Sequence, residues 1–281
     1  MSGVYFAYDG SLHGDWVSHY AVRMAAASAE KKLHLVHVRD DRTSDSERDA
    51  KLGRIRAECR RLGVETELHL PPPAQSAFQA IRASVPPGPD SYLVCGTRSR
   101  EHKRGLLSGT VAERLLRSRH CHVLAIRVVQ PGLLGLPRQL LLPVSGHPRG
   151  FRSGLPLLTL LAPDVSHLQI LYVARVSRWQ FRLLSRESAE QLRRPGQAYC
   201  DRIEQEIRAQ LGPAPPVVDG HVVVSDDVPK EIVIAANKAK SRLIYLGASE
   251  RNLTERFFFG NPVEQVLRDA TCDVAIYRGL A

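Results

Sequence analysis

The sequence has no apolar run long enough to cross a membrane as a helix. Its most apolar stretch, residues 123–146, is interrupted by arginines and prolines, whereas a membrane-spanning helix needs about 20 consecutive apolar residues. The chain also begins directly in a strand-like pattern, without the basic and then apolar segments of a secretory signal. We therefore expect a cytoplasmic protein with no membrane contact.

The sequence also lacks a cysteine pattern that would indicate disulfides or a metal site. It has five cysteines, an odd number, and none belongs to a Cys-x-x-Cys pair. The nearest approach to a metal motif is His120-Cys121-His122, but alternation along a strand directs the two histidines away from the cysteine. A cysteine at the entry of a strand in a reducing compartment is the simpler interpretation. No metal-ligating residue is predicted.

Aromatic residues are sparse, at 6% of the chain, which argues against a surface on which nucleic-acid bases stack. The net charge is +10, but the excess of lysine and arginine is spread over both halves instead of forming one basic tail. Such a charge favours anionic partners in general. Without a recognised nucleic-acid-binding module, it does not predict DNA or RNA binding.

Two well-known phosphate-binding loops are absent, and so is a recognisable catalytic set. The chain has no GxxxxGK[ST] sequence and no GxGxxG sequence between a strand and a helix. Its serines, histidines, aspartates and cysteines form no pattern that can be assigned to nucleophilic catalysis. The sequence therefore favours ligand binding over turnover, and no catalytic residue is predicted.

What the sequence does contain is an internal repeat. Residues 92–127 align with residues 243–278 without a gap. The alignment pairs two glycines, a glutamate and a cysteine with residues of the same type: Gly96 with Gly247, Gly109 with Gly260, Glu113 with Glu264 and Cys121 with Cys272. A repeat of this length indicates two copies of one structural unit.

The two copies differ in length. Residues 6–10 match residues 142–146, an offset of 136, whereas the offset at the end of the repeat is 151. The second copy therefore carries about 15 extra residues, which we expect around residues 175–216. Proline and glycine cluster at 130–137, as is typical of a linker. The predicted domains are residues 1–130 and 131–281.

Each copy alternates strand and helix patterns. In the first copy, short continuous apolar runs predict buried parallel strands at 4–8, 33–38, 66–70, 91–95 and 122–126. Helix patterns lie between them, at about 13–29, 46–63, 74–84 and 110–119. The alternation predicts an α/β fold: two tandem, doubly wound, parallel five-stranded sheets with right-handed crossovers and helices on both faces.

In such a sheet, ligands bind beyond the carboxyl ends of the strands, where the strand order reverses. In the first copy Asp9 follows the first strand, Val38 closes the second and Gly96 ends the fourth. A basic loop at 98–104 then leads to Gly109-Thr110 at the start of a helix. Free N–H groups and the positive end of the helix dipole favour phosphate at such a position.

Each of these features also has a simpler interpretation. Asp9 can serve as a helix cap instead of accepting hydrogen bonds from a ribose hydroxyl or an adenine amine. Gly109-Thr110 can likewise be only the cap of the following helix. The basic loop can be an ordinary solvated surface. The residues alone leave these alternatives open.

At these residues the chain resembles the universal stress protein family, and the resemblance covers nearly all of both halves. The nucleotide motif of that family is glycine, two residues, glycine, nine residues, then glycine followed by serine or threonine. In the first half it reads Gly96, Ser99 and Gly109-Thr110, so that Ser99 replaces the second glycine. The resemblance implies the adenine nucleotide alpha hydrolase-like fold.

The resemblance also implies a binding site for an adenine nucleotide, with ATP as the expected ligand and Mg²⁺ as its candidate companion ion. The residues expected to contact the nucleotide are Ala7, Tyr8, Asp9, Val38, Gly96, Ser99, Gly109, Thr110 and Val111. Some relatives hydrolyse bound ATP slowly, but this sequence offers no residue to nominate as the base.

The second half departs further from the motif. Glu250 brings a negative charge to the phosphate position, Asn261 replaces the hydroxyl, and Pro262 removes a backbone donor. Ser145 stands where the first half has Asp9. We therefore expect the second half to have lost nucleotide binding and to serve structure or partner contact.

Two functions from different classes follow. The first is an ATP-binding regulatory or stress-response protein, and the alternative is a nucleotide-free dimerisation or partner-binding module.

In the universal stress protein family the last strand commonly joins two domains. Residues 123–126 and 274–277 are the corresponding apolar edges here, and such edges need covering. We expect an intramolecular pseudo-dimer through these strands, and a protein partner or a higher homo-oligomer stays open.

Overall fold

The computed structural model describes residues 3–38, 45–72, 76–97, 105–145, 150–212, 215–248 and 262–280. Its first half runs through β1 (Gly3–Tyr8), α1 (Leu12–Ala27), β2 (Lys32–His37), α2 (Asp45–Arg61), β3 (Glu65–His69), α3 (Ala77–Ser84), β4 (Gly88–Gly96), α4 (Val111–Arg117) and β5 (Cys121–Arg127). These elements lie within a few residues of the predicted ones, which confirms the alternation of strands and helices.

The second half follows the same plan with one enlargement. After a 3-10 turn at Pro131–Leu133 it runs through β6 (Gln139–Val144), α5 (Leu155–Leu161), β7 (His167–Arg175), α6 (Arg178–Arg182), α7 (Arg186–Leu211), β8 (Val217–Ser225), α8 (Val228–Lys238), β9 (Leu243–Gly247), α10 (Pro262–Asp269) and β10 (Asp273–Arg278). Between β7 and β8, α6 and the 26-residue α7 stand where the first half has the 17-residue α2. The extra residues therefore lie where the repeat offset predicted them.

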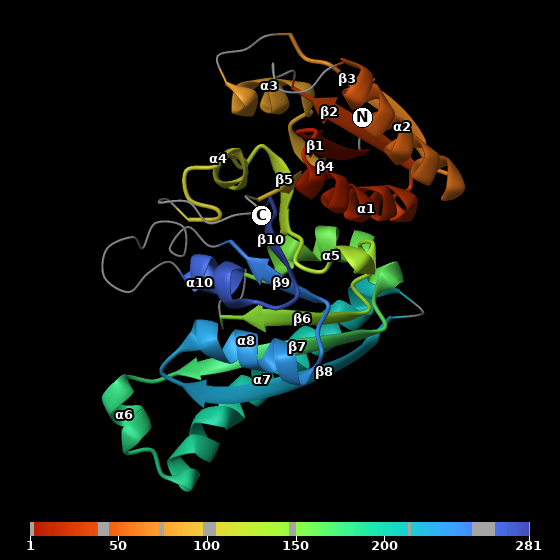
Figure 1. Cartoon of the computed structure of the whole chain (residues 1–281). Helices are drawn as coiled ribbons and strands as arrows, with labels where there is room; N and C mark the ends of the chain where they lie inside the picture. The colour runs from red at the N-terminus through yellow and green to blue at the C-terminus, as the bar shows by residue number, and fades with distance from the viewer. Residues whose placement is uncertain are drawn as a thin grey trace.

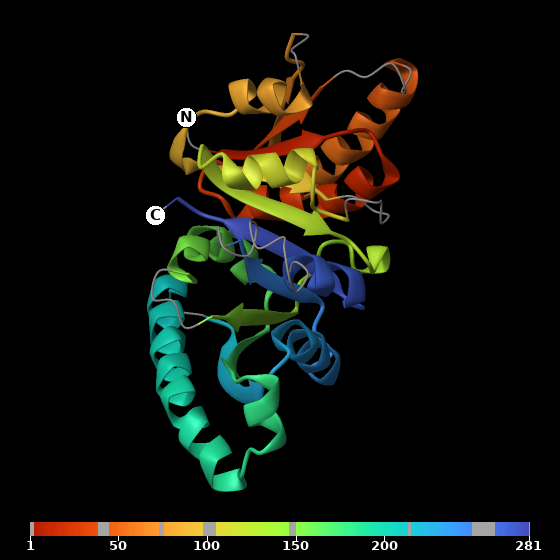
Figure 2. The same ribbon diagram turned by 90° about the vertical axis from the view of Figure 1, so that its left-hand side faces the viewer.

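Within the described residues, ten strands form one continuous sheet in the order β3-β2-β1-β4-β5-β10-β9-β6-β7-β8. Within each half the neighbouring strands are parallel, whereas β5 and β10 pair antiparallel at the centre (Figure 2). Each half has the same strand order when counted from its outer edge. This arrangement confirms the expected pseudo-dimer through the last strands, and it merges the two five-stranded sheets into one.

Helices cover both faces of the sheet (Figure 1). Because side chains alternate along a strand, Phe6 of β1 packs with α1 and α2, while Tyr5 packs with α3 and α4. In the second half α5 and α7 lie on the first of these faces, and α8 and α10 lie on the other. The fold is therefore doubly wound. No helix in the described part of the chain is long and apolar enough to span a membrane.

A buried carboxylate links the two halves where β10 begins. Asp273 is 1% exposed. Its Oδ1 accepts hydrogen bonds from the backbone N–H groups of Val129 (2.7 Å) and Gln130 (2.9 Å), and its Oδ2 accepts one from the Tyr20 hydroxyl (2.7 Å). Burial raises the pKa of Asp273, and these hydrogen bonds counteract part of that shift. The last strand of the second half is thereby tied to α1 and to the connection between the halves.

The repeat places His122 where the second half has Asp273, and His122 has the reciprocal role. The backbone N–H of Leu280 donates to His122 Nδ1 across 3.3 Å. The His122 ring also stacks on Tyr92, with ring centres 5.3 Å apart. Each half therefore uses a side chain from the start of its last strand to hold the backbone that follows the last strand of the other half.

We expect Asp273→Ala to lower the free energy of unfolding by about 3 kcal/mol, because buried donors left without an acceptor each cost about 1–3 kcal/mol. Asp273→Asn should cost about 1 kcal/mol or less, since its oxygen can still accept from the two N–H groups and its amide can donate to Tyr20. Urea unfolding of both variants measures the difference. Equal stabilities of Asp273→Ala and the unsubstituted protein would show that this carboxylate does not hold the halves together.

Candidate functional site

The parallel strands β1, β2 and β4 end at the same edge of the first half. β1 and β4 are neighbours, and the chain leaves β1 toward β2 on one side and comes back to β4 on the other. The space above the ends of β1 and β4 is therefore the point at which the strand order reverses. Asp9 follows β1 directly, and Gly96 is the last residue of β4. The structure brings these two predicted site residues to the two strands that flank this point.

Asp9 takes part in the cap of α1. Its Oδ1 accepts from the backbone N–H of Ser11 (3.0 Å) and from the Ser11 hydroxyl (2.7 Å), while that hydroxyl oxygen accepts from the N–H of Gly14 (2.9 Å). Gly14 makes room for this arrangement, because a Cβ there would lie 2.6 Å from Asp9 Oδ1. Asp9 nevertheless stays exposed to solvent. The capping interpretation thus has a geometric basis, and it leaves the carboxylate at the surface.

Three of the predicted contact residues lie on the same side of the sheet, two at strand ends and one at the start of α4. Ala7, Val38 and Val111 are partly buried against the hydrophobic cluster under α3 and α4. Tyr8 packs on the opposite face, where its hydroxyl donates to Asp15. Burial, reinforced by Asp15, raises the pKa of the Tyr8 phenol. The Tyr8 side chain therefore lies away from the face that the other three share.

The start of α4 is capped by its own residues. Thr110 Oγ1 accepts from the N–H of Glu113 (3.1 Å) and donates to the carbonyl of Leu107 (2.6 Å). The N–H of Gly109 donates to Glu113 Oε2 (2.6 Å), and the φ of 73° at Gly109 is one that glycine adopts without strain. At a helix start the first N–H groups have no acceptor within the helix, so Val111 contributes such a donor at this edge.

A carboxylate from the second half occupies the turn just before Gly109. Glu264, in α10, is 7% exposed. Its oxygens accept from the backbone N–H groups of Leu106 (2.8 Å), Leu107 (2.8 Å) and Ser108 (2.7 Å). Gly105 lets the carboxylate approach, because a Cβ there would lie 2.8 Å from it. These consecutive N–H groups form an anion-binding nest, and the anion that fills it is a side chain of the same protein.

Sequence analysis missed His13, which lies in the first turn of α1. It is 7% exposed, and a Cβ on Gly96 would lie 3.2 Å from its ring. Its Nε2 donates to the carbonyl of Ile126 (3.3 Å), and burial lowers its pKa. Burial thus favours the neutral ring, whose Nδ1 carries a lone pair when Nε2 bears the proton, and the described residues supply no partner for Nδ1. In the sequence, His13 could have been noticed as a histidine on an otherwise apolar face of the first predicted helix.

Several predicted positions lie outside the described residues. They are Ser99 and the rest of the basic loop at 98–104, together with Glu250, Gly260 and Asn261 of the second half. Pro262 is described and is the first residue of α10, and Ser145 is exposed just after β6.

The end of β9 differs from the end of β4 in a described feature. A Cβ on Gly247 would lie 3.0 Å from the hydroxyl of Tyr277. The repeat pairs Tyr277 with Ile126 of the first half. The Tyr277 ring stacks on Tyr245 with ring centres 4.3 Å apart, and its hydroxyl donates to the carbonyl of Gly150 (3.3 Å). A buried aromatic ring therefore lies beside the end of β9, where the first half has an isoleucine and His13.

Comparison with known families identifies the fold. Residues 157–278 match the Universal stress protein family. Most of the second half is therefore similar to a universal stress protein domain. The resemblance noted in the sequence is thereby confirmed, and the match lies in the half whose nucleotide motif departs further from the family pattern. The first half repeats the strand order of this domain and joins it through the antiparallel pair.

Solved structures share this two-domain arrangement. A universal stress protein from Archaeoglobus fulgidus superimposes with a TM-score of 0.63 at 15% identity, over 98% of this chain and 96% of its own. A putative universal stress protein from Pseudomonas aeruginosa gives 0.59 at 18% identity, over 99% and 92%. The cytoplasmic domain of a prokaryotic cation chloride cotransporter gives 0.53 at 12% identity, over 100% and 96%. No curated protein matches the sequence. At these identities the likeness concerns the fold.

The contact between Glu264 and the turn at 105–108 yields a prediction. We expect Gly105→Ala to lower the free energy of unfolding by about 1–3 kcal/mol, because the φ of 92° is strained for alanine and the methyl group would meet the Glu264 carboxylate. The control is Gly53→Ala in α2, where a Cβ meets no atom within 4 Å. That change should instead stabilise the protein by roughly 0.5–1 kcal/mol. Urea unfolding of both variants decides whether the nest is as tight as described.

Proposed function

We propose that this chain is a universal stress protein, an ATP-binding regulatory or stress-response protein that holds one adenine nucleotide in its first half. The observation that carries the proposal is the position of Asp9 and Gly96 at the ends of β1 and β4, the strands that flank the reversal of strand order. The proposal concerns binding without a chemical step, and it nominates no catalytic residue.

In this proposal the nucleotide lies across that edge. The adenine packs against the partly buried Ala7, Val38 and Val111, and the exposed Asp9 accepts a hydrogen bond from the ribose. The phosphates, with Mg²⁺ beside them, lie between Gly96 and the start of α4. Glu264 supports this arrangement indirectly, because it holds the turn at 106–108 that positions Gly109 and Thr110.

The unpartnered Nδ1 of His13 also supports a ligand at this edge. Buried polar atoms in proteins nearly always have a hydrogen-bond partner, and this one lies beside Gly96. A neutral imidazole with its proton on Nε2 can only accept at Nδ1. A hydroxyl or amine donor of the nucleotide, or a water molecule bound with it, has the matching chemistry.

A second candidate function is the nucleotide-free interaction module, and one observation favours it. The N–H groups of Leu106, Leu107 and Ser108 are bound by Glu264, and that of Gly109 is bound by Glu113. Donors at the place where phosphates are expected are therefore already engaged by protein carboxylates. In this alternative the same contacts only fasten the two halves together.

Calorimetric titration of the purified chain with ATP and Mg²⁺ should give one nucleotide per chain. The second half lacks the carboxylate after its first strand, and Pro262 has no N–H to offer at the start of α10. A stoichiometry of two would contradict the asymmetry that we propose. No binding at millimolar ATP would exclude the nucleotide site and leave the interaction module.

Substitutions at the first residues of α4 and α10 test whether the start of α4 binds a nucleotide or serves only as a helix cap. Val111→Asp removes a partly buried apolar side chain but adds a carboxylate where a helix start favours negative charge, so α4 should still form. The same carboxylate would replace an apolar contact of the adenine and bring a negative charge toward a polyanionic ligand; at roughly 4 Å such a pair of like charges costs about 4 kcal/mol at an effective dielectric constant of 20, and ATP affinity should fall at least about 100-fold. The matched control is Pro262→Asp in the second half, which should leave ATP affinity unchanged. Equal ATP affinities of both variants and the unsubstituted protein would contradict the site.

Two substitutions of Asp9 test its role. Asp9→Ala should lower the affinity for ATP about 5- to 150-fold, as expected for the loss of one good hydrogen bond. Asp9→Asn keeps an oxygen that can accept from Ser11, and it therefore reports on the loss of charge without the loss of the cap. If Asp9 is only a cap, Asp9→Ala lowers the melting temperature and neither variant changes ATP affinity.

A further inference from the structure

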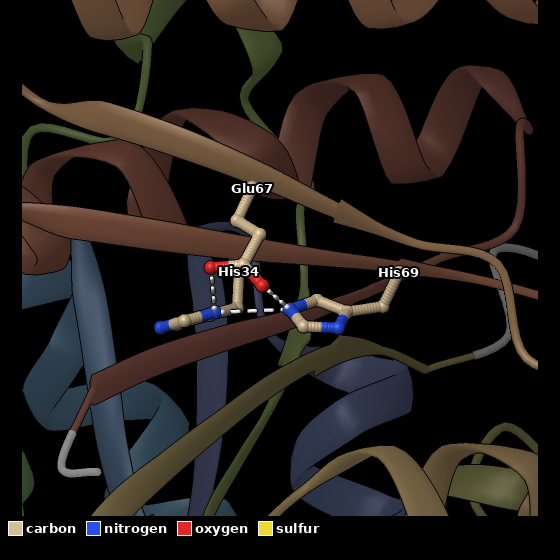
Figure 3. Close-up of side chains that lie close together, drawn as sticks. All are labelled: His34, Glu67 and His69. Carbon is tan, nitrogen blue, oxygen red and sulfur yellow. Dashed lines mark hydrogen bonds and ion pairs between the residues drawn. The ribbon is translucent and has the colours of Figure 1, made fainter.

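Two histidines and a glutamate converge on the outer part of the sheet in the first half (Figure 3). His34 belongs to β2, while Glu67 and His69 belong to the edge strand β3. The parallel register places His34 beside Glu67 and Val36 beside His69. Because side chains alternate along a strand, Glu67 and His69 lie on the same face, and their contacts with His34 show that its ring reaches that face too.

The distances among the three side chains are close to those of metal ligands. His34 Nδ1 lies 3.0 Å from His69 Nε2 and 3.6 Å from Glu67 Oε2, and His69 Nε2 lies 3.5 Å from Glu67 Oε1. Nitrogen and oxygen ligands bound tetrahedrally at 2.0–2.2 Å are separated from one another by about 3.3–3.6 Å. The three groups therefore span one triangular face of a tetrahedron of that size after small side-chain shifts.

We propose that His34, Glu67 and His69 form a binding site for a first-row divalent transition metal ion, with Zn²⁺ as the representative. Two imidazoles and one carboxylate are a donor set suited to zinc and its neighbours, whereas Mg²⁺ and Ca²⁺ prefer oxygen ligands throughout. With three protein ligands, a fourth position stays open for water or an external ligand.

The surroundings hold one ligand rigidly and leave the others accessible. His34 is 3% exposed, and its ring stacks on Tyr5 with centres 4.4 Å apart and planes 14° from parallel. Gly3 admits this ring, because a Cβ there would lie 3.1 Å from His34 Nε2. The side chains of Glu67 and His69 are 46% and 29% exposed. An ion can therefore enter from solvent at the edge strand and meet a preoriented imidazole.

Without a metal ion the same groups satisfy one another. One of the two facing ring nitrogens donates to the other, and Lys32 Nζ forms an ion pair with Glu67 Oε2 at 2.7 Å. A metal ion needs a lone pair on both nitrogens, which the rings provide when each carries its proton on the other nitrogen. It must also compete with the partly exposed Lys32 ammonium for the Glu67 carboxylate. Metal binding therefore excludes the hydrogen bond between the two imidazoles and is opposed by the ion pair of Lys32 with Glu67.

The test is Zn²⁺ titration of the full chain, stripped with a chelator and free of any histidine tag, by calorimetry and by thermal unfolding. One Zn²⁺ per chain should bind and raise the melting temperature, since a ligand that binds only the folded state stabilises it, and Mg²⁺ should not replace it. His69→Ala should lower the affinity for Zn²⁺ by more than about 100-fold, because losing a direct ligand has a larger effect than losing a residue that only supports a ligand.

Two further variants test whether Zn²⁺ binds at His34, Glu67 and His69 and not at another histidine. Lys32→Gln should tighten Zn²⁺ binding several-fold, because it removes the cation that competes for Glu67. The matched control is His167→Ala, since His167 pairs with Asp219 at 2.6 Å on the equivalent strands β7 and β8 and should not change Zn²⁺ affinity. Equal Zn²⁺ affinities of His69→Ala and the unsubstituted protein, or no binding by the latter at micromolar Zn²⁺, would overturn the proposal.

Discussion

The antiparallel pairing of β5 with β10 joins the two halves into one sheet, with Val274 opposite Arg127 and Arg278 opposite Val123. Both strands are almost entirely buried, so neither half could leave its last strand open to solvent without exposing a long apolar edge. The pairing also sets the distance between α4 and α10 and between each last strand and the backbone of the other half. The contacts of Asp273, His122 and Glu264 all depend on it.

The contacts across this junction are unequal, although the backbone is nearly symmetric. Asp273 accepts three hydrogen bonds from the first half, while its counterpart His122 accepts one from Leu280. Glu264 fills the nest that precedes Gly109. The turn leading into the proposed phosphate site of the first half is therefore held by the second half. In the proposed function, the half whose motif departs further from the family pattern would thus support the site of the other half.

Much of the fold could be predicted from the sequence, because strand and helix patterns and the ungapped repeat report on local structure. The pairing of residues 123–126 with 274–277 was expected because the last strand commonly joins two domains in the universal stress protein family and because both apolar edges need covering. Other features depend on side chains that meet only after folding. Glu264 was noted as a repeated residue, but its contact with residues 106–108 requires the junction to form.

The candidate site likewise contains some residues that the sequence could identify and others that only the folded structure shows. Asp9 and Gly96 were identifiable because they lie at the carboxyl ends of predicted strands and match the family's motif, whereas His13 looked like an ordinary residue on a helix face. His34 and His69 are far apart in sequence, and only the parallel register of β2 and β3 brings them within 3.0 Å. The prediction of no metal-ligating residue rested on sequence spacing, which does not detect side chains that neighbouring parallel strands bring together.

The most direct test of the account is native-state hydrogen exchange at the central strand pair. If β5 and β10 are the shared core of one structure, their amides should be among the most protected in the chain. They should also exchange through the same opening, with equal free energies and equal dependence on urea. Exchange of β5 and β10 with clearly different free energies, each following the unfolding of its own half, would contradict the central claim that the two domains form a single sheet.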